Sequence, residues 1–285
     1  MPDWRTSVFT SPSYAKSQSS GGKSIRLSRI SDYATGRTLV VPLDHSVTIG
    51  PLGKADHANS LVRTLAQAGT NAVVLHRGRA KHVDPAHFAR MGLIVHLSAG
   101  TTRSMDLDSK VLVGGVEDAL RIGADAVSVH VNIGSSTERE QLLDFGRVSH
   151  ECEVLGVPLL AMMYARGPLR GDLPSDPAEL MHLAAIATDL GADLVKLDYS
   201  GTPESMREVA ESCPLPICVA GGPPLEDVDE HALALGAEIL SSGVAGLSFG
   251  RNVFEARNPF AVASALARMM HSPQESASRS ELEIA

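Results

Sequence analysis

One lysine stands inside an apolar run, where a charged side chain is costly to bury. Lys196 lies between Val195 and Leu197 in the segment 193–199. Burial disfavours the charged form of a lysine and lowers its pKa. A neutral lysine amine attacks carbonyl carbons and forms a Schiff base. We therefore expect Lys196 to be an uncharged nucleophile. The alternative is a lysine that reaches solvent at its strand end or pairs with Asp198.

Two other side chains could move protons next to this amine. Tyr164 ends the apolar run 158–164, and its phenol could relay a proton at a substrate carbon. Asp44 ends the run 39–44, where a carboxylate could handle the proton of a substrate hydroxyl. Each has a structural alternative, a buried tyrosine with a satisfied hydroxyl or an aspartate that caps a helix or turn. The residues alone leave both alternatives open.

Two glycine-rich segments near the end of the chain are typical of anion sites. Gly221 and Gly222 follow one apolar run, and Gly250 and Arg251 follow the last one. Glycine lets backbone N–H groups approach phosphate oxygens closely, and a helix start adds a favourable dipole. Arginine adds two parallel hydrogen bonds. We predict a phosphate site here, while the alternative is that these glycines only form tight turns.

Eight short apolar runs are the elements that must position these side chains. They occupy residues 39–44, 72–76, 93–98, 126–132, 158–164, 193–199, 216–222 and 246–251. Longer segments with helix composition separate them, in units of roughly 30 residues, which indicates a parallel sheet. Eight units in roughly 250 residues predict an α/β fold, a single (β/α)8 TIM barrel. A doubly wound open sheet is the rival. A shorter run at 110–115 is either a ninth strand or an insertion.

Nearly every run ends in a polar residue or a glycine, and the carboxyl ends of barrel strands form the active face. Because side chains alternate along a strand, Ser128, His130 and Asn132 share one side of their strand. Lys196 and Asp198 likewise share one side of theirs. We expect these polar side chains to face the barrel axis and the intervening apolar ones to face the helices.

Composition restricts the class of protein. The 285 residues carry a net charge of −8, which disfavours a general nucleic-acid binder. Three cysteines without paired spacing argue against a disulfide scaffold and fit a reducing compartment, so we expect a cytoplasmic protein. No apolar run is long enough to span a membrane. We expect disordered tails at residues 1–24 and 272–285 around a barrel formed by residues 25–271.

Four histidines near strand ends could in principle hold a metal ion; they are His45, His76, His96 and His130. No closely spaced histidine pair accompanies a carboxylate in ligand spacing. Pocket lining or hydrogen bonding to a substrate is the more typical use of such residues. We therefore expect no metal and no organic cofactor.

Eight motifs together resemble the archaeal-type class I aldolases. They are VPLDHSVTIGP, NAVVLHRG, LIVHLSAGT, GADAVSVHVNIGS, PLLAMMYARG, GADLVKLDYSG, ICVAGGP and GRNVF, in this order between about Ile25 and Met270. The family includes fructose-1,6-bisphosphate aldolases and 2-amino-3,7-dideoxy-D-threo-hept-6-ulosonate synthases. It also includes the 2-amino-4,5-dihydroxy-6-oxo-7-(phosphonooxy)heptanoate synthases, which supply a precursor of 3-amino-4-hydroxybenzoate.

The resemblance implies a (β/α)8 barrel with Lys196 as the Schiff-base lysine of the sixth strand, Tyr164 as its proton relay and Asp44 as acid/base. Its phosphate loops would match Gly221, Gly222, Gly250 and Arg251. The residues that it implies for substrate binding are His45, His130, Asp198, Ser200 and Gly201. Relatives of this kind form homo-oligomers of five or ten subunits, and their substrates are small sugar phosphates and aldehydes.

Departures from the family pattern bear on the substrate. Ser46 replaces a glycine that many relatives have, and Asp198 adds a carboxylate beside the lysine. Met162 stands where the fructose-bisphosphate branch tends to carry tryptophan, and the run Asp-His-Ser-Val-Thr is most similar to the aminohydroxybenzoate-precursor branch. The resemblance thus implies dihydroxyacetone phosphate as donor and L-aspartate 4-semialdehyde as acceptor.

Several alternatives remain open. Glyceraldehyde 3-phosphate as acceptor would make the protein a fructose-bisphosphate aldolase. A deoxyketohexose phosphate donor would make it an aminoheptulosonate synthase. Two other classes are a barrel that binds a sugar phosphate without catalysis and a metal-dependent aldolase built on the histidines.

Overall fold

The structure is a computed structural model of the 285-residue chain, and it describes residues 21–52, 57–168, 176–224 and 227–271. The expected tails, residues 1–24 and 272–285, lie outside the described residues except for 21–24. Those four residues begin helix α1 (Gly21–Ile30), so the boundary expected at residue 24 is wrong by this much. They are held because the buried Lys23 forms ion pairs with Glu153 at 2.8 Å and with Asp193 at 3.1 Å.

Eight parallel strands close into a barrel in the order β1-β10-β9-β8-β7-β6-β3-β2, which confirms the predicted fold and excludes the open sheet. The strands are β1 (Thr38–Pro42), β2 (Ala72–His76), β3 (Gly92–His96), β6 (Ala126–Ile133), β7 (Leu159–Ala165), β8 (Leu194–Leu197), β9 (Ile217–Ala220) and β10 (Gly246–Ser248). Each lies within or overlaps one of the eight apolar runs.

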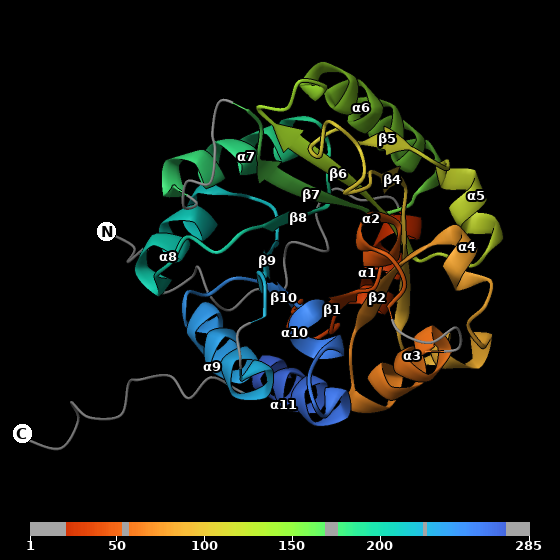
Figure 1. The fold of residues 1–285 in the computed structure, drawn as a ribbon, viewed down its shortest axis with the longest axis vertical. Helices are drawn as coiled ribbons and strands as arrows, with labels where there is room; N and C mark the ends of the chain where they lie inside the picture. The colour runs from red at the N-terminus through yellow and green to blue at the C-terminus, as the bar shows by residue number, and fades with distance from the viewer. Residues whose placement is uncertain (1–20, 53–56, 169–175, 225–226, 272–285) are drawn as a thin grey trace, which may run out of the picture.

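Helices surround the strands, as Figure 1 shows. The longer ones are α3 (His57–Ala68), α6 (Glu138–Leu155), α7 (Pro177–Asp189), α8 (Pro203–Ser212), α9 (Val228–Ser241) and α11 (Pro259–His271); the shorter ones are α2 (His45–Ile49), α4 (Arg77–Ala80), η3 (Pro85–Ala89), α5 (Val116–Arg121) and α10 (Arg251–Phe254). Caps fix some of their starts: the side chain of Asp176 accepts a hydrogen bond from the Ala178 N–H ahead of α7. The last helix, α11, packs against α3 and completes the outer ring.

The short run at 110–115 is an insertion and not a ninth barrel strand. Its β5 (Val111–Leu112) pairs antiparallel with β4 (Ser98–Ala99), which follows β3 directly. This small hairpin lies over the carboxyl ends of β3 and β6. It therefore belongs to the mouth of the barrel and adds nothing to the barrel wall.

Two apolar layers confirm the predicted alternation along the strands. Val127, Val129 and Val131 belong to the layer between strands and helices. The inner layer fills the barrel and includes Val40, Val74, Ile94, Leu160 and Leu194. Helix α1 contributes Ile30 to this inner layer and closes the amino ends of the strands. Toward the carboxyl ends of the strands the inner positions change to polar residues. The amino ends of the barrel are therefore filled by apolar side chains, and the carboxyl ends carry the residues that could do chemistry.

No described helix combines the length and the apolar character that crossing a bilayer requires.

Candidate active site

Lys196 points into the barrel and does not reach solvent. The residue is 8% exposed, and its strand neighbours in register are Met162 on β7 and Cys218 on β9. Its Nζ lies 6.0 Å from the centre of the Tyr164 ring. The alternative of a lysine that reaches solvent at its strand end is therefore wrong.

The charge of Lys196 differs from the expectation. Burial acts to lower its pKa, as expected, but the Tyr164 oxygen and the carboxylates of Asp44 and Asp198 oppose burial and raise the pKa above its ordinary value. The expectation of a neutral amine in the free protein is therefore wrong. Lys196 is an ammonium at neutral pH and must give up a proton before it can attack a carbonyl carbon.

Asp44 is an ionised carboxylate directed at imidazoles. It stands at the N-cap position of α2 but its side chain makes no capping hydrogen bond, so the helix-capping alternative for this residue is wrong. Its oxygens lie 3.6 Å from His45 Nδ1 and 3.7 Å from His96 Nε2. Burial acts to raise its pKa, but the imidazoles and the Lys196 ammonium outweigh burial and bring the pKa to about 2. The carboxylate is thus available as a proton acceptor.

The histidines around Asp44 are neutral at neutral pH. Burial is the main cause: it lowers the pKa of His96 to about 4 and also lowers those of His45 and His76, although Asp44 opposes it in each case. His96 Nδ1 shares a hydrogen bond of 2.8 Å with the Ser128 hydroxyl, which leaves Nε2 toward Asp44. Within the described part of the chain, no group of three or more His, Cys, Asp or Glu residues is arranged to hold a metal ion.

Tyr164 is held between two side chains. The His130 ring lies 4.6 Å from the Tyr164 ring, and the Arg166 guanidinium lies 4.1 Å above it. His130 Nε2 hydrogen-bonds the Asn132 oxygen at 2.8 Å, and the Asn132 amide donates to the Asp108 carbonyl at 2.8 Å. These contacts give His130 the geometry of a residue that positions the phenol.

Asp198, Ser200 and Gly201 form the turn from β8 to α8. Asp198 continues the inward face of β8 and acts on Lys196 through its charge. The Ser200 hydroxyl pairs with the Ser205 hydroxyl at 2.8 Å, and Gly201 takes a φ of 98°, which favours glycine. Of the three, Asp198 is thus the one that the structure brings to the lysine.

The predicted phosphate loops follow β9 and β10 and lie side by side. A Cβ at Gly221 would clash with the Asn252 side chain, so the two loops touch through this glycine. Gly222 has a φ of 66° and also requires glycine. The Asn252 amide and the Ser248 hydroxyl are buried here with no hydrogen-bond partner among the described residues. Arg251 opens α10 beside them.

The close packing around Gly250 yields a prediction. A Cβ there would lie 2.7 Å from His45 Cε1 and 2.9 Å from the Pro42 carbonyl oxygen. Because the carbonyl cannot move away, we expect Gly250→Ala to shift this loop, to destabilise the fold by about 1–3 kcal/mol and to raise the KM of a phosphorylated donor. Thermal unfolding and donor kinetics measure both effects. In Gly146→Ala on α6, where the Cβ meets nothing within 4 Å, the KM should stay at the wild-type level and the stability should not fall, because alanine is the better helix former.

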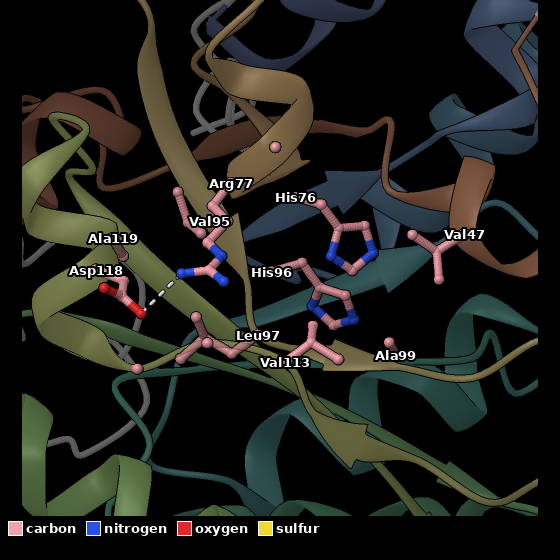
Figure 2. A pocket seen from close by; sticks show the side chains of 13 residues that line it. Val47, His76, Arg77, Val95, His96, Leu97, Ala99, Val113, Asp118 and Ala119 are labelled. Carbon is pink, nitrogen blue, oxygen red and sulfur yellow. Dashed lines mark hydrogen bonds and ion pairs between the residues drawn. The ribbon is translucent and has the colours of Figure 1, made fainter.

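A cavity of about 270 Å³ adjoins His76 and His96 on the side away from the phosphate loops. Figure 2 shows it between these rings and the pair formed by Arg77 and Asp118, whose Nη1 and Oδ2 lie 2.9 Å apart. Its other walls are mostly apolar, with Val95 and Val113 among them. The imidazoles of the active site therefore form one wall of a second space.

Sequence reasoning missed part of this environment. His76 and His96 were noted as polar strand ends but were not assigned to the site, and Lys110 and Arg166 were not considered. The sequence did contain a signal for Arg166. It stands two residues after Tyr164, so its side chain could lie on the same side of the strand as the phenol, at the mouth of the barrel. The sequence contained no such signal for Lys110, because the hairpin of β4 and β5 is what brings the loop of Lys110 over the barrel.

Known proteins are similar to this chain in sequence and in fold. A 2-amino-4,5-dihydroxy-6-oxo-7-(phosphonooxy)heptanoate synthase of Streptomyces griseus is 48% identical over 250 residues, which cover 87% of this chain and 90% of that protein. A 2-amino-3,7-dideoxy-D-threo-hept-6-ulosonate synthase of Halobacterium salinarum is 39% identical, with coverages of 88% and 92%. An archaeal fructose-1,6-bisphosphate aldolase, solved with its catalytic lysine bound to a carbinolamine intermediate, matches with a TM-score of 0.77 and 26% identity, with coverages of 87% and 99%.

A family profile described as DeoC/LacD family aldolase matches residues 38–256, which span β1 to the end of α10. The match includes the inward lysine of β8 together with both glycine loops. This chain therefore belongs to the DeoC/LacD aldolase family and is a Schiff-base-forming aldolase.

Proposed function

We propose that this aldolase joins dihydroxyacetone phosphate to L-aspartate 4-semialdehyde through an imine on Lys196. The product would be the seven-carbon amino ketose phosphate for which the Streptomyces griseus relative is named. The observation that carries the proposal is the buried Lys196 amine, which lies 6.0 Å from the centre of the Tyr164 ring and within the field of the ionised Asp44.

The first half of the reaction makes a nucleophilic carbon from the donor. The Lys196 ammonium passes its proton to the Asp44 carboxylate, and the neutral amine adds to the donor ketone. The carbinolamine hydroxyl leaves as water with a proton from Tyr164, which gives an iminium ion. The Tyr164 phenolate then takes a proton from the neighbouring hydroxymethyl carbon, and the iminium becomes an enamine.

The second half forms the carbon–carbon bond. The enamine carbon attacks the aldehyde carbon, and the new alkoxide takes the proton that Asp44 received from the lysine. Water then hydrolyses the product iminium and restores the Lys196 ammonium. Asp44 thus ends as the carboxylate that its pKa of about 2 requires in the free protein. The glycine loops with Arg251 hold the donor phosphate throughout.

The test combines trapping with competing substrates. Borohydride added with dihydroxyacetone phosphate should leave one donor mass on the Lys196 peptide, and an adduct on another lysine, or none, contradicts the proposal. The kcat/KM is then compared for aspartate semialdehyde and glyceraldehyde 3-phosphate as acceptors. A preference for the second would favour the fructose-bisphosphate reaction, which the archaeal aldolase structure supports. A third arm uses a deoxyketohexose phosphate as donor, as the Halobacterium salinarum relative suggests.

We also propose that the enzyme works in the cytoplasm as a homo-oligomer. Its three cysteines are free thiols, and burial raises the pKa of Cys152 and Cys218 to about 12, so neither is reactive. The presence of unpaired thiols supports a reducing compartment. Light scattering of the purified protein measures the subunit number, and a monomeric mass contradicts the oligomer.

A further inference from the structure

The cavity beside His76 and His96 lies apart from the residues that the proposed reaction uses. Its walls come from α2, α4, the end of β3 with β4, and the start of α5. Lys196, Tyr164 and the loops after β9 and β10 are not among the described residues that line it. It meets the active site through the two imidazoles, of which His96 lies 3.7 Å from Asp44. The cavity is thus a separate space that shares one wall with the active site.

The walls of the cavity suit an apolar ligand. Its aliphatic side chains are Val47, Val95, Leu97, Ala99, Val113 and Ala119, and Figure 2 shows them around the His76 and His96 rings. Burial lowers the pKa of both imidazoles, so the rings are neutral at neutral pH. Neutral rings pack against a flat aromatic group as other aromatic side chains do. The body of a fitting ligand is therefore small, apolar and preferably aromatic.

Three glycines in the wall help to keep this space open. They are Gly78, Gly114 and Gly115. None of them has the positive φ that favours glycine. A Cβ would meet nothing within 4 Å at Gly78, and only ordinary contacts at 3.7 Å or more at the other two. Glycine costs conformational entropy on folding, yet neither the backbone nor the packing requires it at these positions. A ligand in the space that larger side chains would reduce accounts for all three.

Arg77 gives the cavity a partner for an anion. Among the residues that the structure describes, its guanidinium bonds to Asp118 alone, through Nη1 at 2.9 Å. A guanidinium has five N–H donors, so donors remain for a carboxylate. Asp118 also pairs with Arg121 at 3.2 Å, and Arg121 does not line the cavity. Asp118 therefore keeps a cationic partner when Arg77 turns to a ligand.

We propose that this cavity binds a small apolar carboxylate, with its body against the imidazoles and its carboxylate on Arg77. A space of about 270 Å³ holds roughly ten non-hydrogen atoms, which is the size of benzoate. The inference goes beyond the proposed reaction, whose donor and acceptor bind elsewhere at the mouth of the barrel. A bound ligand would replace water beside His96, and through this one ring it would alter the surroundings of Asp44.

The first test is calorimetric titration of the full-length protein with benzoate. We expect one saturable site per chain. Benzamide has nearly the same shape without the charge, and it should bind about tenfold more weakly or worse, because it loses the charge-assisted hydrogen bonds to the guanidinium. Equal binding of the two compounds, or no binding of benzoate at millimolar concentration, would contradict the proposal.

Four variants locate the ligand. Arg77→Gln should weaken benzoate binding about tenfold and leave benzamide binding unchanged. Asp118→Asn should strengthen benzoate binding, because it removes the carboxylate that competes for Arg77. Ala99→Leu fills part of the cavity and should abolish the binding of both compounds. Arg121→Gln is the matched control: it touches the same Asp118 from outside the cavity and should leave the affinity within about twofold. Thermal unfolding of each variant checks that the barrel is intact.

Competition experiments separate this site from the substrate sites. Saturating benzoate should leave the borohydride adduct of dihydroxyacetone phosphate on Lys196 unchanged, and aspartate semialdehyde should not displace bound benzoate. Loss of the adduct, or displacement by the aldehyde, would place benzoate among the substrates and overturn the inference. Wild-type affinity in both Arg77→Gln and Ala99→Leu would overturn it as well. Because the titrations need no turnover, failure of the proposed function would leave them valid.

Discussion

Lys196→Met is expected to lower kcat/KM by at least about 10⁴-fold, because methionine removes the amine that forms the covalent imine in the proposed cycle. Methionine fills a similar volume, and an apolar side chain needs no partner in a site where Lys196 is 8% exposed. The barrel should therefore stay folded, and the loss should be one of chemistry. Initial rates and intact mass after borohydride treatment with dihydroxyacetone phosphate measure the two expected changes.

The control for this variant is Lys81→Met, which removes an exposed lysine at the end of α4. It should give the wild-type rate and the same single adduct. Retention of the adduct in Lys196→Met would place the imine on another lysine. A loss of less than about tenfold would contradict covalent catalysis at this position altogether.

The fold was predictable because its signal is local. Each barrel strand is a short apolar run next to a helical segment, so eight runs could be counted without knowing what they touch. The alternation of inward and outward side chains along a run could be predicted in the same way. It placed the side chain of Val127 outside the barrel and that of Lys196 inside, and the structure confirms both. The same local reading identified the residues at the strand ends.

The charge of Lys196 was not predictable from its own run. The carboxylate of Asp44 follows β1, which is separated from β8 by β9 and β10 in the barrel order. Only closure of the barrel brings the two charges together across its mouth. A sequence argument sees the apolar neighbours of the lysine and infers desolvation alone, and that gives the opposite direction for its pKa.

The boundary at residue 24 has the same cause. The segment 21–24 is polar and glycine-rich, which is typical of a tail. Its Lys23 is nevertheless buried, because its partners Glu153 and Asp193 lie 130 and 170 residues further along the chain. Long-range ion pairs leave no trace in the local composition.

Asp44→Asn should separate the proton transfer of that carboxylate from the effect of its charge. In the cycle proposed above, Asp44 takes the proton of Lys196 and gives it to the new alkoxide, so asparagine is expected to lower kcat about 10²- to 10³-fold. The same change removes a negative charge that helps to raise the pKa of Lys196. That pKa should therefore fall, and more of the lysine should be neutral at any given pH.

The sign of the pH effect follows from which form reacts. Only the neutral amine attacks the ketone, so below the pKa of Lys196 the rate of imine formation rises about tenfold for each pH unit. In a plot of the rate of imine formation against pH, this increase is the rising limb. Lowering the pKa of Lys196 moves that limb to lower pH. In Asp44→Asn, imine formation with dihydroxyacetone phosphate should thus begin at lower pH than in the wild-type enzyme, while turnover is slower.

Rapid trapping with cyanoborohydride across a pH series measures the limb, and steady-state assays measure turnover. Asp44→Glu keeps the charge and should leave the limb near its wild-type position. Asp198→Asn should move it in the same direction but less, because Asp198 is a smaller cause of the raised pKa than Asp44. A limb that stays in place or moves to higher pH in Asp44→Asn would mean that this carboxylate does not act on the lysine. Slow turnover combined with an unchanged pH dependence of imine formation would then confine Asp44 to proton transfer.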